Sequence, residues 1–523
     1  GCRTPMPAIP AEPASIMVDG RHPLTIEDVV AVARGTAVAR LSDAGDFLAR
    51  IGRGADFVDR LIAEDGVVYG VSTGYGDSCT VAIPPALVHE LPHQLYAYHG
   101  VGLGRFLDAG ETRAVLLARL VSLAQGSSGV SVALLRQLQA LLRHDILPRI
   151  PAEGSVGASG DLTPLSYVAA VLCGEREVLH DGAVKPAGEA LAAHGLQPLR
   201  LRPKEGLAIM NGTAVMTALA CLAWQRADYL GRLATRITAF NLVASAGNAH
   251  HFDEALFAVK PHPGQQRVAG RLRADLATAR PSRNEQRLQD RYSLRCAPHV
   301  IGVLQDALPW LRTNIENELN SANDNPIIDA DAGMVLHGGH FYGGHIAFAM
   351  DSLKNLVANL ADLLDRQMAL LVDARYNHGL PANLSAARGE RAALNHGLKA
   401  LQISASAWTA EALKLTMPAS VFSRSTECHN QDKVSMGTIA ARDCLRVIEL
   451  TEQVVAALLV TARQGMALRR AHEGSAKLSD DAEAMFLDLE ARIPLVEEDR
   501  ALDRDLHGLL AAIRDEAWRL YVD

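Results

Sequence analysis

The chain has 523 residues, enough for several domains or for one large fold. Hydrophobic residues make up 49% of it, charged residues 21% and aromatic residues 5%, with a formal net charge of −8. This composition is typical of a globular protein. The mixed charges, with no basic stripe, argue against nucleic-acid binding and against binding to an anionic membrane.

The first 20 residues are rich in Pro and Ala and predict a flexible N-terminal segment. They lack the apolar run of a signal peptide, and the chain has no stretch of about 18 apolar residues that could span a membrane. Seven scattered cysteines without a CxxC motif argue against a disulfide framework or a zinc site. We therefore expect a cytoplasmic protein.

Most of the chain has the periodicity of helices. Short, turn-rich segments, including residues 67–77, come first, and apolar residues then recur at three- and four-residue spacing. The strongest patterns cover residues 112–125, 131–146, 351–375 and 436–468. Helices this long and apolar bury one another, so the sequence predicts a mainly α protein built on a long-helix bundle.

The segment GSVGASGDLTP, residues 154–164, places three glycines around Ser159. A flexible turn before a helix capped by Asp161 or Thr163 is one interpretation. A phosphate-binding loop is another, but neither GxxxxGK[ST] nor GxGxxG is present. A third is backbone cyclisation. The nitrogen of Gly160 attacks the carbonyl of Ala158, and loss of water closes a five-membered ring. Loss of the Ser159 hydroxyl then leaves a conjugated electrophile.

The same segment resembles the signature of the histidine, phenylalanine and tyrosine ammonia-lyases and the related aminomutases. In that family Ala-Ser-Gly forms 4-methylidene-imidazole-5-one (MIO), so the resemblance implies this group at Ala158, Ser159 and Gly160, with no metal and no external cofactor. Seven further motifs follow the family order: VYGVSTGYGD (68–77), EGLAIMNGT (205–213), KPHPGQ (260–265), QDRYSLRCAPHVIG (289–302), NSANDNP (320–326), LHGGHFYGGH (336–345) and HNQDKVSMG (429–437).

The resemblance also implies a division of the chain and an assembly. It predicts a flexible segment at 1–20, an N-terminal part at 21–205 with the catalytic tyrosine loop and the MIO tripeptide, and a helical bundle with C-terminal helices at 206–523. The family's fold is a long-helix bundle with a smaller, loop-rich part that carries an active-site lid. Its site is shared between the subunits of a homotetramer.

Each step of the reaction then has a candidate residue. The amine of an α-amino acid leaves poorly and its β-proton is weakly acidic, so an electrophile must capture the amine and a base must remove the proton. By resemblance the base is Tyr69, whose phenolate needs nearby donors or positive potential because an ordinary tyrosine has a pKa near 10. Arg295 resembles the carboxylate clamp. The remaining candidates are Tyr292 and Asn211 beside the electrophile, Gln289 as a polar contact and Phe341 stacked near the ring.

Substrate choice depends on residues expected at the far end of the pocket. Tyr98 and His99 match the pair that faces the substrate side chain, and a polar pair favours a ring that can hydrogen-bond. Gln431, followed by Asp432, resembles tyrosine and phenylalanine lyases, whereas Glu427 resembles phenylalanine lyases and aminomutases. These signals favour L-tyrosine, giving trans-p-coumarate, over phenylalanine, with histidine third.

His340 stands where relatives commonly have asparagine and is therefore a candidate for substrate orientation. Metal binding by the histidines of HGGHFYGGH or of NAHHFDE is disfavoured, because neither segment has an HExxH motif or a matched Cys/His set. A 2,3-aminomutase shares every catalytic motif and stays an alternative to the lyase. A non-catalytic scaffold is disfavoured by the intact Ala158-Ser159-Gly160.

Overall fold

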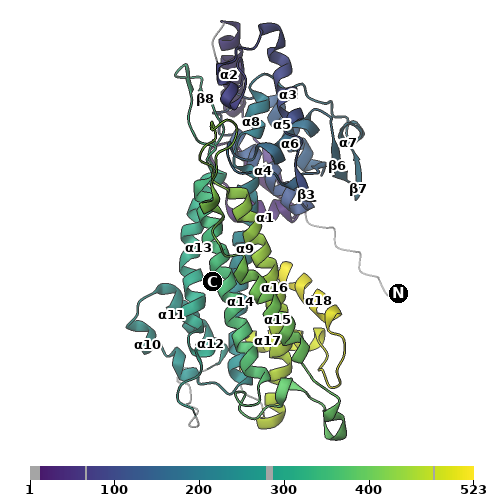
Figure 1. The fold of residues 1–523 in the computed structure, drawn as a ribbon, viewed down its shortest axis with the longest axis vertical. Coiled ribbons are helices and arrows are strands. Elements are labelled where there is room, and N and C mark those ends of the chain that lie inside the picture. Colours follow the sequence, from purple (N-terminus) through teal and green to yellow (C-terminus); the bar gives the residue numbers. More distant parts are fainter. Residues whose placement is uncertain (1–11, 65–67, 278–286, 475–477, 523) are drawn as a thin grey trace, which may run out of the picture. The chain divides into compact units, whose positions relative to one another are not determined.

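A computed structural model describes residues 12–64, 68–277, 287–474 and 478–522 of the chain. Helices dominate it, which confirms the mainly α prediction (Figure 1). The described residues form two compact units: unit 1 comprises those of 1–222, 314–348 and 419–441, and unit 2 those of 223–313, 349–418 and 442–523. Four of the five unit boundaries fall inside α9 (Ala214–Ala244), α13 (Ala297–Leu319), α14 (Gly344–Val372) and α16 (Gly437–Glu473), and the fifth lies between residues 418 and 419.

This division differs from the single boundary that the sequence predicted near residue 205. Two later segments, 314–348 and 419–441, return to unit 1. The periodicity of a helix predicts which face is buried but carries no information about where along its length one compact unit ends. The strong helical patterns at 351–375 and 436–468 are nevertheless confirmed by α14 and α16.

Unit 1 begins with a strand where the sequence predicted a flexible segment. Strand β1 (Ala14–Val18) pairs in parallel with β2 (Ala37–Leu41), and Val18 is buried at the end of this pairing. The prediction of a flexible 1–20 segment is therefore wrong for residues 14–18, and residues 1–11 lie outside the described residues. Helix α1 (Ile26–Ala33) connects the two strands.

Helix α4 (Ala109–Leu123) is a central element of unit 1, since side chains on all its faces are buried from Ala114 to Leu123. Asp108 and Glu111 form a capping box at its start, with Asp108 accepting from the Glu111 amide at 2.7 Å. Helix α5 (Val132–Arg143) follows and is capped by Ser131. The helices expected at 112–125 and 131–146 are thus confirmed within a few residues.

Short elements complete unit 1. The strands are β3 (Leu103–Phe106) with β5 (Pro151–Glu153), β4 (Leu147–Pro148) with β6 (Glu177–His180) and β7 (Ala183–Pro186), and β8 (Ile327–Asp329) with β9 (Met334–Leu336). The helices are α2 (Gly45–Ala63), α3 (Leu91–Tyr98), α6 (Leu162–Leu172), α7 (Ala187–Ala193), α8 (Glu205–Met210) and the 3₁₀ turns η1 (Gly76–Thr80), η2 (Pro85–Glu90) and η6 (Ala419–Phe422).

In unit 2, the parts of α13 and α14 that belong to this unit pack against α9. Within this unit, Trp224 of α9 donates to the carbonyl of Leu308 in α13 at 2.9 Å, and Asn241 donates to Gln367 in α14 at 2.8 Å. Buried polar groups paired in this way keep the register of neighbouring helices. The other elements are α10 (Glu254–Ala258), α11 (Pro263–Asp275), α12 (Tyr292–Arg295), α15 (Lys399–Lys414), α17 (Asp480–Arg492), α18 (Asp503–Arg514), η3 (Ala249–Phe252), η4 (Ala382–Leu384) and η5 (Gly389–Ala393).

The described residues bear on two further predictions, which concern membrane-spanning helices and disulfide bonds. Within the described ranges, none of the helices combines the length and apolarity needed to span a membrane. The six described cysteines are free thiols, and Cys2 lies outside the described residues.

Candidate active site

The Ala158-Ser159-Gly160 tripeptide lies in the loop between β5 and α6. Ala158 and Gly160 form a β-bridge with each other, so the backbone folds back on itself at Ser159. Gly160 has φ +74°, and a Cβ built on it would lie 2.0 Å from the carbonyl oxygen of Gly212. Only glycine combines this backbone conformation with such a close approach. The structure therefore contains the tight, unobstructed backbone that the cyclisation hypothesis requires.

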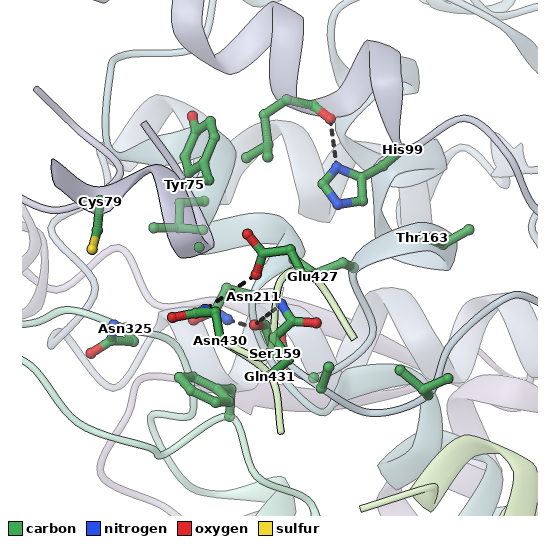
Figure 2. A pocket seen from close by; sticks show the side chains of 18 of the residues that line it. Tyr75, Cys79, His99, Ser159, Thr163, Asn211, Asn325, Glu427, Asn430 and Gln431 are labelled. Atoms are coloured by element: carbon green, nitrogen blue, oxygen red, sulfur yellow. Dashed lines mark hydrogen bonds between the residues drawn. The ribbon is translucent and has the colours of Figure 1, made fainter. Parts of the chain in front are cut away.

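Two amide side chains hold Ser159 from segments far apart in the sequence. Asn211, at the end of α8, donates from Nδ2 to the Ser159 carbonyl oxygen at 2.8 Å. Gln431 donates from Nε2 to the Ser159 hydroxyl at 3.2 Å (Figure 2). Asn211 thus lies beside Ser159 as predicted, whereas Gln431, predicted as a determinant of substrate choice, contacts Ser159 as well.

The Asp161 carboxylate holds the loop that contains Ser159 in place. It occupies the N-cap position of α6, but its carboxylate makes no capping bond. It accepts instead from the Met216 amide at 3.0 Å, from the Ser155 hydroxyl at 2.9 Å and from the Thr438 hydroxyl. Burial raises the pKa of Asp161, while the hydrogen bonds from Thr438, Met216 and Ser155 act in the opposite direction. Asp161, one of the two predicted caps, thus connects this loop to α9 and α16 through its side-chain hydrogen bonds.

A buried guanidinium supports the Asn211 side of the site. Arg119 of α4 donates from Nη1 to the Asn211 carbonyl at 3.3 Å and from Nη2 to Asn323 Oδ1 at 3.1 Å. The same Asn323 oxygen accepts from the Thr213 amide at 3.1 Å. Sequence reasoning missed Arg119, because nothing in an apolar helical pattern marks one arginine as facing a site.

Tyr69 lies in a loop that is anchored at its start. Its neighbours Val68 and Val71 are buried in a hydrophobic cluster with Val58 and Ile328. The segment is a loop, as predicted, and its tyrosine oxygen accepts from the Gly76 amide at 2.5 Å. Residues 65–67, at the start of the expected lid, lie outside the described residues.

The surroundings of Tyr69 in unit 1 do not favour the phenolate form that a base needs. Burial raises the pKa of its phenol, the hydrogen bond from Gly76 lowers it, and the negative charge of Glu427 and the nearby Cys79 raise it further. The expected stabilisation of the phenolate is therefore only partly present among the described residues. Further donors or positive charge must act on this oxygen if it is to accept a proton near neutral pH.

Glu427 belongs to a tightly wound turn. Glu427, Cys428 and His429 all have positive φ values, of 54°, 55° and 60°. The Glu427 carboxylate accepts from the Asp77 amide at 2.6 Å and from Asn430 Nδ2 at 3.2 Å. It thus ties this turn to the loop that carries Tyr69, and Figure 2 draws it between His99 and Ser159 in that view.

His99 caps the C-terminus of α3. Its Nδ1 lies 2.8 Å from the Leu95 carbonyl, and the other ring nitrogen is turned toward the side of the pocket where Glu427 lies (Figure 2). A carbonyl can only accept, so Nδ1 carries the proton. Burial lowers the pKa of His99, although the Leu95 bond and Glu427 act in the opposite direction. A neutral ring protonated at Nδ1 presents Nε2 as an acceptor.

These groups line one cavity of about 750 Å³ in unit 1. Of the predicted residues, it is lined by Tyr69, Tyr98, His99, Ala158, Ser159, Gly160, Asn211, Phe341, Glu427 and Gln431. It is also lined by three residues that no sequence pattern marked for a catalytic or substrate-binding role, Tyr75, Asn325 and His337. The Tyr75 hydroxyl is buried without a hydrogen-bond partner among the described residues.

Four predicted residues do not line this cavity. His340 is exposed, and its neighbour His337 lines the cavity instead. Gln289, Tyr292 and Arg295 belong to unit 2 and line a second cavity of about 530 Å³. There the Arg295 guanidinium carbon lies 4.9 Å from the centre of the Tyr292 ring, so these two side chains are neighbours. Their membership of the same site as Ser159 stays a prediction.

The two histidine-containing segments considered for metal binding line different cavities. His250 and His251 line the second cavity, and His337 lines the first. Across the portion of the chain that the structure describes, no group of three or more His, Cys, Asp or Glu side chains is arranged to hold a metal ion.

The comparisons with known proteins agree with this arrangement. The family described as "Aromatic amino acid lyase" matches residues 24–490. This chain belongs to the aromatic amino acid lyase family. It is 40% identical over 503 residues to a histidine ammonia-lyase of Gloeobacter violaceus, an alignment that covers 96% of each chain.

Solved structures of the family have the same fold. A tyrosine aminomutase from Streptomyces globisporus superposes with a TM-score of 0.88 at 33% identity, over 97% of each chain. A histidine ammonia-lyase from Trypanosoma cruzi superposes with a TM-score of 0.87 at 31% identity, over 96% of this chain and 94% of that one. The long-helix bundle of the ammonia-lyase type is therefore confirmed. The preference for tyrosine finds no support among the sequence relatives, which are named histidine ammonia-lyases.

Proposed function

We propose that this chain is an ammonia-lyase that converts L-histidine into ammonium and the trans-α,β-unsaturated acid. Relatives of 35–40% identity named histidine ammonia-lyase support this substrate. It replaces the expectation of tyrosine. The observation that carries the proposal is the pair of hydrogen-bond acceptors that the cavity presents at His99 and Glu427.

Two acceptors select for a ring with two donors. Nε2 of neutral His99 accepts, and the Glu427 carboxylate accepts with a full negative charge. A protonated imidazole offers two N–H groups and a positive charge, so it satisfies both acceptors. A phenol offers one O–H donor, and plain benzene offers none. The Glu427 carboxylate keeps its bonds from Asp77 and Asn430 with any substrate, so what it loses with an uncharged ring is the attraction of the imidazolium charge. His99 Nε2 left without a donor costs about 1–3 kcal/mol. Both effects favour histidine over phenylalanine, and the charge attraction favours it over tyrosine.

Tyrosine is the second candidate because of Tyr98. Tyr98 lines the same cavity, and burial, with the nearby Tyr69 and Glu427, raises the pKa of its phenol to about 12, so it stays a donor. A phenol could donate to His99 or Glu427 and accept from Tyr98. The structural similarity to a tyrosine aminomutase is in line with this alternative and with return of the amine to the β-carbon.

The residues around Ser159 fit the MIO group that the family implies. Ala158 and Gly160 already form a bridge, the site of a Gly160 Cβ is filled by the Gly212 carbonyl, and Asn211 donates to the Ser159 carbonyl. Ala158, Ser159 and Gly160 would supply its atoms, and Asn211 would hold it. Such a group supplies an electrophile for the amine of the substrate.

The chain's own side chains then have defined tasks. Tyr69 takes the β-proton on its phenolate oxygen, which the Gly76 amide already contacts. Gln431, with its amide at Ser159, and Phe341 bound the space in which the amino acid lies. His99 and Glu427 fix the ring, so that the β-carbon is presented to Tyr69 in one orientation.

We propose that a second copy of the chain completes this site, as the family resemblance implies. Arg295 would hold the substrate carboxylate in a bidentate pair, but it lines the cavity of unit 2 together with Tyr292 and Gln289. The raised pKa of Tyr69 likewise calls for positive charge that unit 1 does not supply in the described residues. We therefore include in the proposal a homotetramer whose sites take residues from more than one subunit.

Purified protein incubated separately with L-histidine, L-tyrosine and L-phenylalanine tests the function. Absorbance of the conjugated acid and released ammonium should rise together with L-histidine, at a kcat/KM at least about tenfold above that for L-tyrosine. Ser159→Ala is the matched inactive control. Chromatography for β-amino acids distinguishes an aminomutase. A kcat/KM higher for L-tyrosine than for L-histidine would overturn the proposed substrate.

A further inference from the structure

Arg176 has a backbone conformation that a long side chain rarely adopts. It connects α6 to β6 and has φ 65°, in the left-handed region that favours glycine. Such a conformation persists where contacts of the side chain hold it in place. The question is what the guanidinium does there.

The guanidinium connects two helices that line the active-site cavity. Its Nη2 donates to the Tyr96 carbonyl in α3 at 2.5 Å, and its Nη1 donates to the Ser166 hydroxyl in α6 at 3.3 Å. Its central carbon lies 4.4 Å from the centre of the Tyr167 ring, a cation–π contact. All three contacts lie in unit 1.

The Tyr96 carbonyl is one of the last in α3, the helix that presents Tyr98 and His99. The Leu95 carbonyl contacts His99 Nδ1 at 2.8 Å, and the Ala97 carbonyl accepts from the Gly100 amide at 3.2 Å. Arg176 thus satisfies the carbonyl between these two. A positive charge at a helix C-terminus also stabilises that end through the helix dipole.

The contact between Arg176 and Ser166 links the guanidinium to the backbone of His99 through one side chain. Ser166 Oγ, which accepts from Arg176, lies 3.2 Å from the His99 carbonyl oxygen and 2.7 Å from that of Thr163. The guanidinium also fills the space beside Gly100, because a Cβ built there would lie 2.6 Å from Arg176 Nη2. Both the helix end and the residue after it are therefore held by one side chain.

We propose that Arg176 is a positioning residue for substrate recognition: it fixes the C-terminus of α3 and so sets where the His99 ring meets the ring of the substrate. Arg176 does not line the cavity and touches no reacting group. The inference rests on the proposed function in one respect, namely that His99 contacts the substrate ring.

Glycine at this position removes the guanidinium and suits the backbone. Arg176→Gly should therefore still fold, because relief of the left-handed backbone offsets part of the lost contacts, while the brace on α3 is gone. For the preferred substrate with a polar ring, we expect KM to rise about tenfold with kcat little changed. The contact between His99 and the substrate ring is weakened, and this contact stabilises the bound substrate and the transition state equally. The kcat/KM for L-phenylalanine should stay the same. Arg176→Lys, which keeps a charge and a donor, should recover part of the loss.

Two variants make the test specific. Asp181→Gly, at φ 50° in the β6–β7 turn, is the matched control for placing glycine at a left-handed position and should leave KM unchanged. In a His99→Phe background, Arg176→Gly should have no further effect on discrimination, since the residue through which it acts is gone. Intact mass confirms the loss of two water molecules in every variant, so the electrophile is present throughout.

The outcomes separate the two proposals. If Arg176→Gly keeps the wild-type discrimination, or reduces it equally in the His99→Phe background, the positioning role is overturned. If His99→Phe itself leaves discrimination against L-phenylalanine unchanged, the ring-end assignment in the proposed function is wrong. The cycle is run with whichever ring-polar amino acid the wild type prefers, so a substrate other than histidine does not affect the test of Arg176.

Discussion

At the residue scale, the hydrogen bonds made to Ser159 indicate its chemical role. Its carbonyl accepts from the Asn211 amide and its hydroxyl accepts from the Gln431 amide, which come from two segments 220 residues apart in the sequence. A donor on the carbonyl suits an oxygen that gains electron density, and a donor on the hydroxyl suits a group that must leave. Both contacts thus favour the dehydration by which the electrophile would form.

Ser159→Ala tests this reasoning because alanine keeps the size of the loop residue and removes the leaving hydroxyl. We expect turnover to fall by at least about a thousandfold, since the substrate amine then meets no electrophile. The Tm should stay close to that of the wild type. Mass spectrometry should find the full deficit of two water molecules in the wild type and not in the variant. Near-normal turnover would remove the electrophile from the mechanism.

Tyr69 and Glu427 give a prediction about pH. Tyr69 acts as a base only when deprotonated, so the rate rises with pH through its pKa, and a raised pKa places this rise at higher pH. Burial is the main cause of that raised pKa, and the Glu427 charge adds to it. Glu427→Gln removes the charge and should move the ascending limb of kcat against pH toward lower values.

The control for that pH profile is Glu177→Gln, which removes an exposed carboxylate outside the cavity. It should leave the ascending limb where the wild type has it. An unchanged limb in Glu427→Gln would mean that another group, and not Tyr69, sets the rise in rate.

At the element scale, the loop between β5 and α6 depends on glycine for two separate reasons. Gly160 and Gly182 have the same φ of +74°, but a Cβ at Gly160 meets the Gly212 carbonyl, whereas a Cβ at Gly182 meets no atom within 4 Å among the described residues. The pair therefore separates backbone strain from steric exclusion.

Gly182→Ala should cost about 1–2 kcal/mol in unfolding free energy, the ordinary cost of a left-handed alanine. Gly160→Ala should cost this and about 1–3 kcal/mol more, because the Gly212 carbonyl must move. It should also lose the two-water mass deficit, which Gly182→Ala keeps. Denaturant unfolding and mass spectrometry measure both, and equal stabilities of the two variants would contradict the steric argument.

The same elements show how far sequence reasoning reaches. Apolar periodicity predicts α4, α5, α14 and α16 because burial of one face is a local property of the sequence. It did not predict the pairing of β1 with β2, which depends on residues brought together by α1. The glycines around Ser159 predict a tight turn, but the direction of the Asp161 carboxylate is set by Met216 and Thr438, more than 50 residues away.

The site itself was predictable to the extent that its residues come from motifs. Tyr69, Ser159 and Gln431 line one cavity as expected, because each stands in a segment with a family pattern. Arg119 and Arg176 carry no such pattern, since their roles depend on the carbonyls they meet after folding. His337 lines the cavity in place of His340, a shift of three residues in a glycine-rich segment where spacing does not fix direction.

At the scale of the whole molecule, the candidate residues are divided between two cavities. Tyr69, Ser159 and Glu427 line the cavity of unit 1, whereas Tyr292 and Arg295 line that of unit 2. Large apolar side chains are also exposed on unit 2, among them Val259, Ile403 and Met417. Exposed apolar side chains of this size are typical of a surface that contacts a partner, which is in line with the proposed homotetramer.

Complementation between two inactive variants tests the shared site. Ser159→Ala lacks the electrophile and Arg295→Ala lacks the carboxylate clamp, so each homo-oligomer should be inactive. If every site takes Ser159 from one chain and Arg295 from another, refolding the two variants together in equal amounts makes about a quarter of the sites intact. We expect activity to return to about that fraction of the wild type, measured as ammonium release. Mixing the variants without unfolding is the control and should give no recovery. If co-refolding also restores nothing, while wild-type protein refolded in parallel regains its activity, Ser159 and Arg295 act within the same chain.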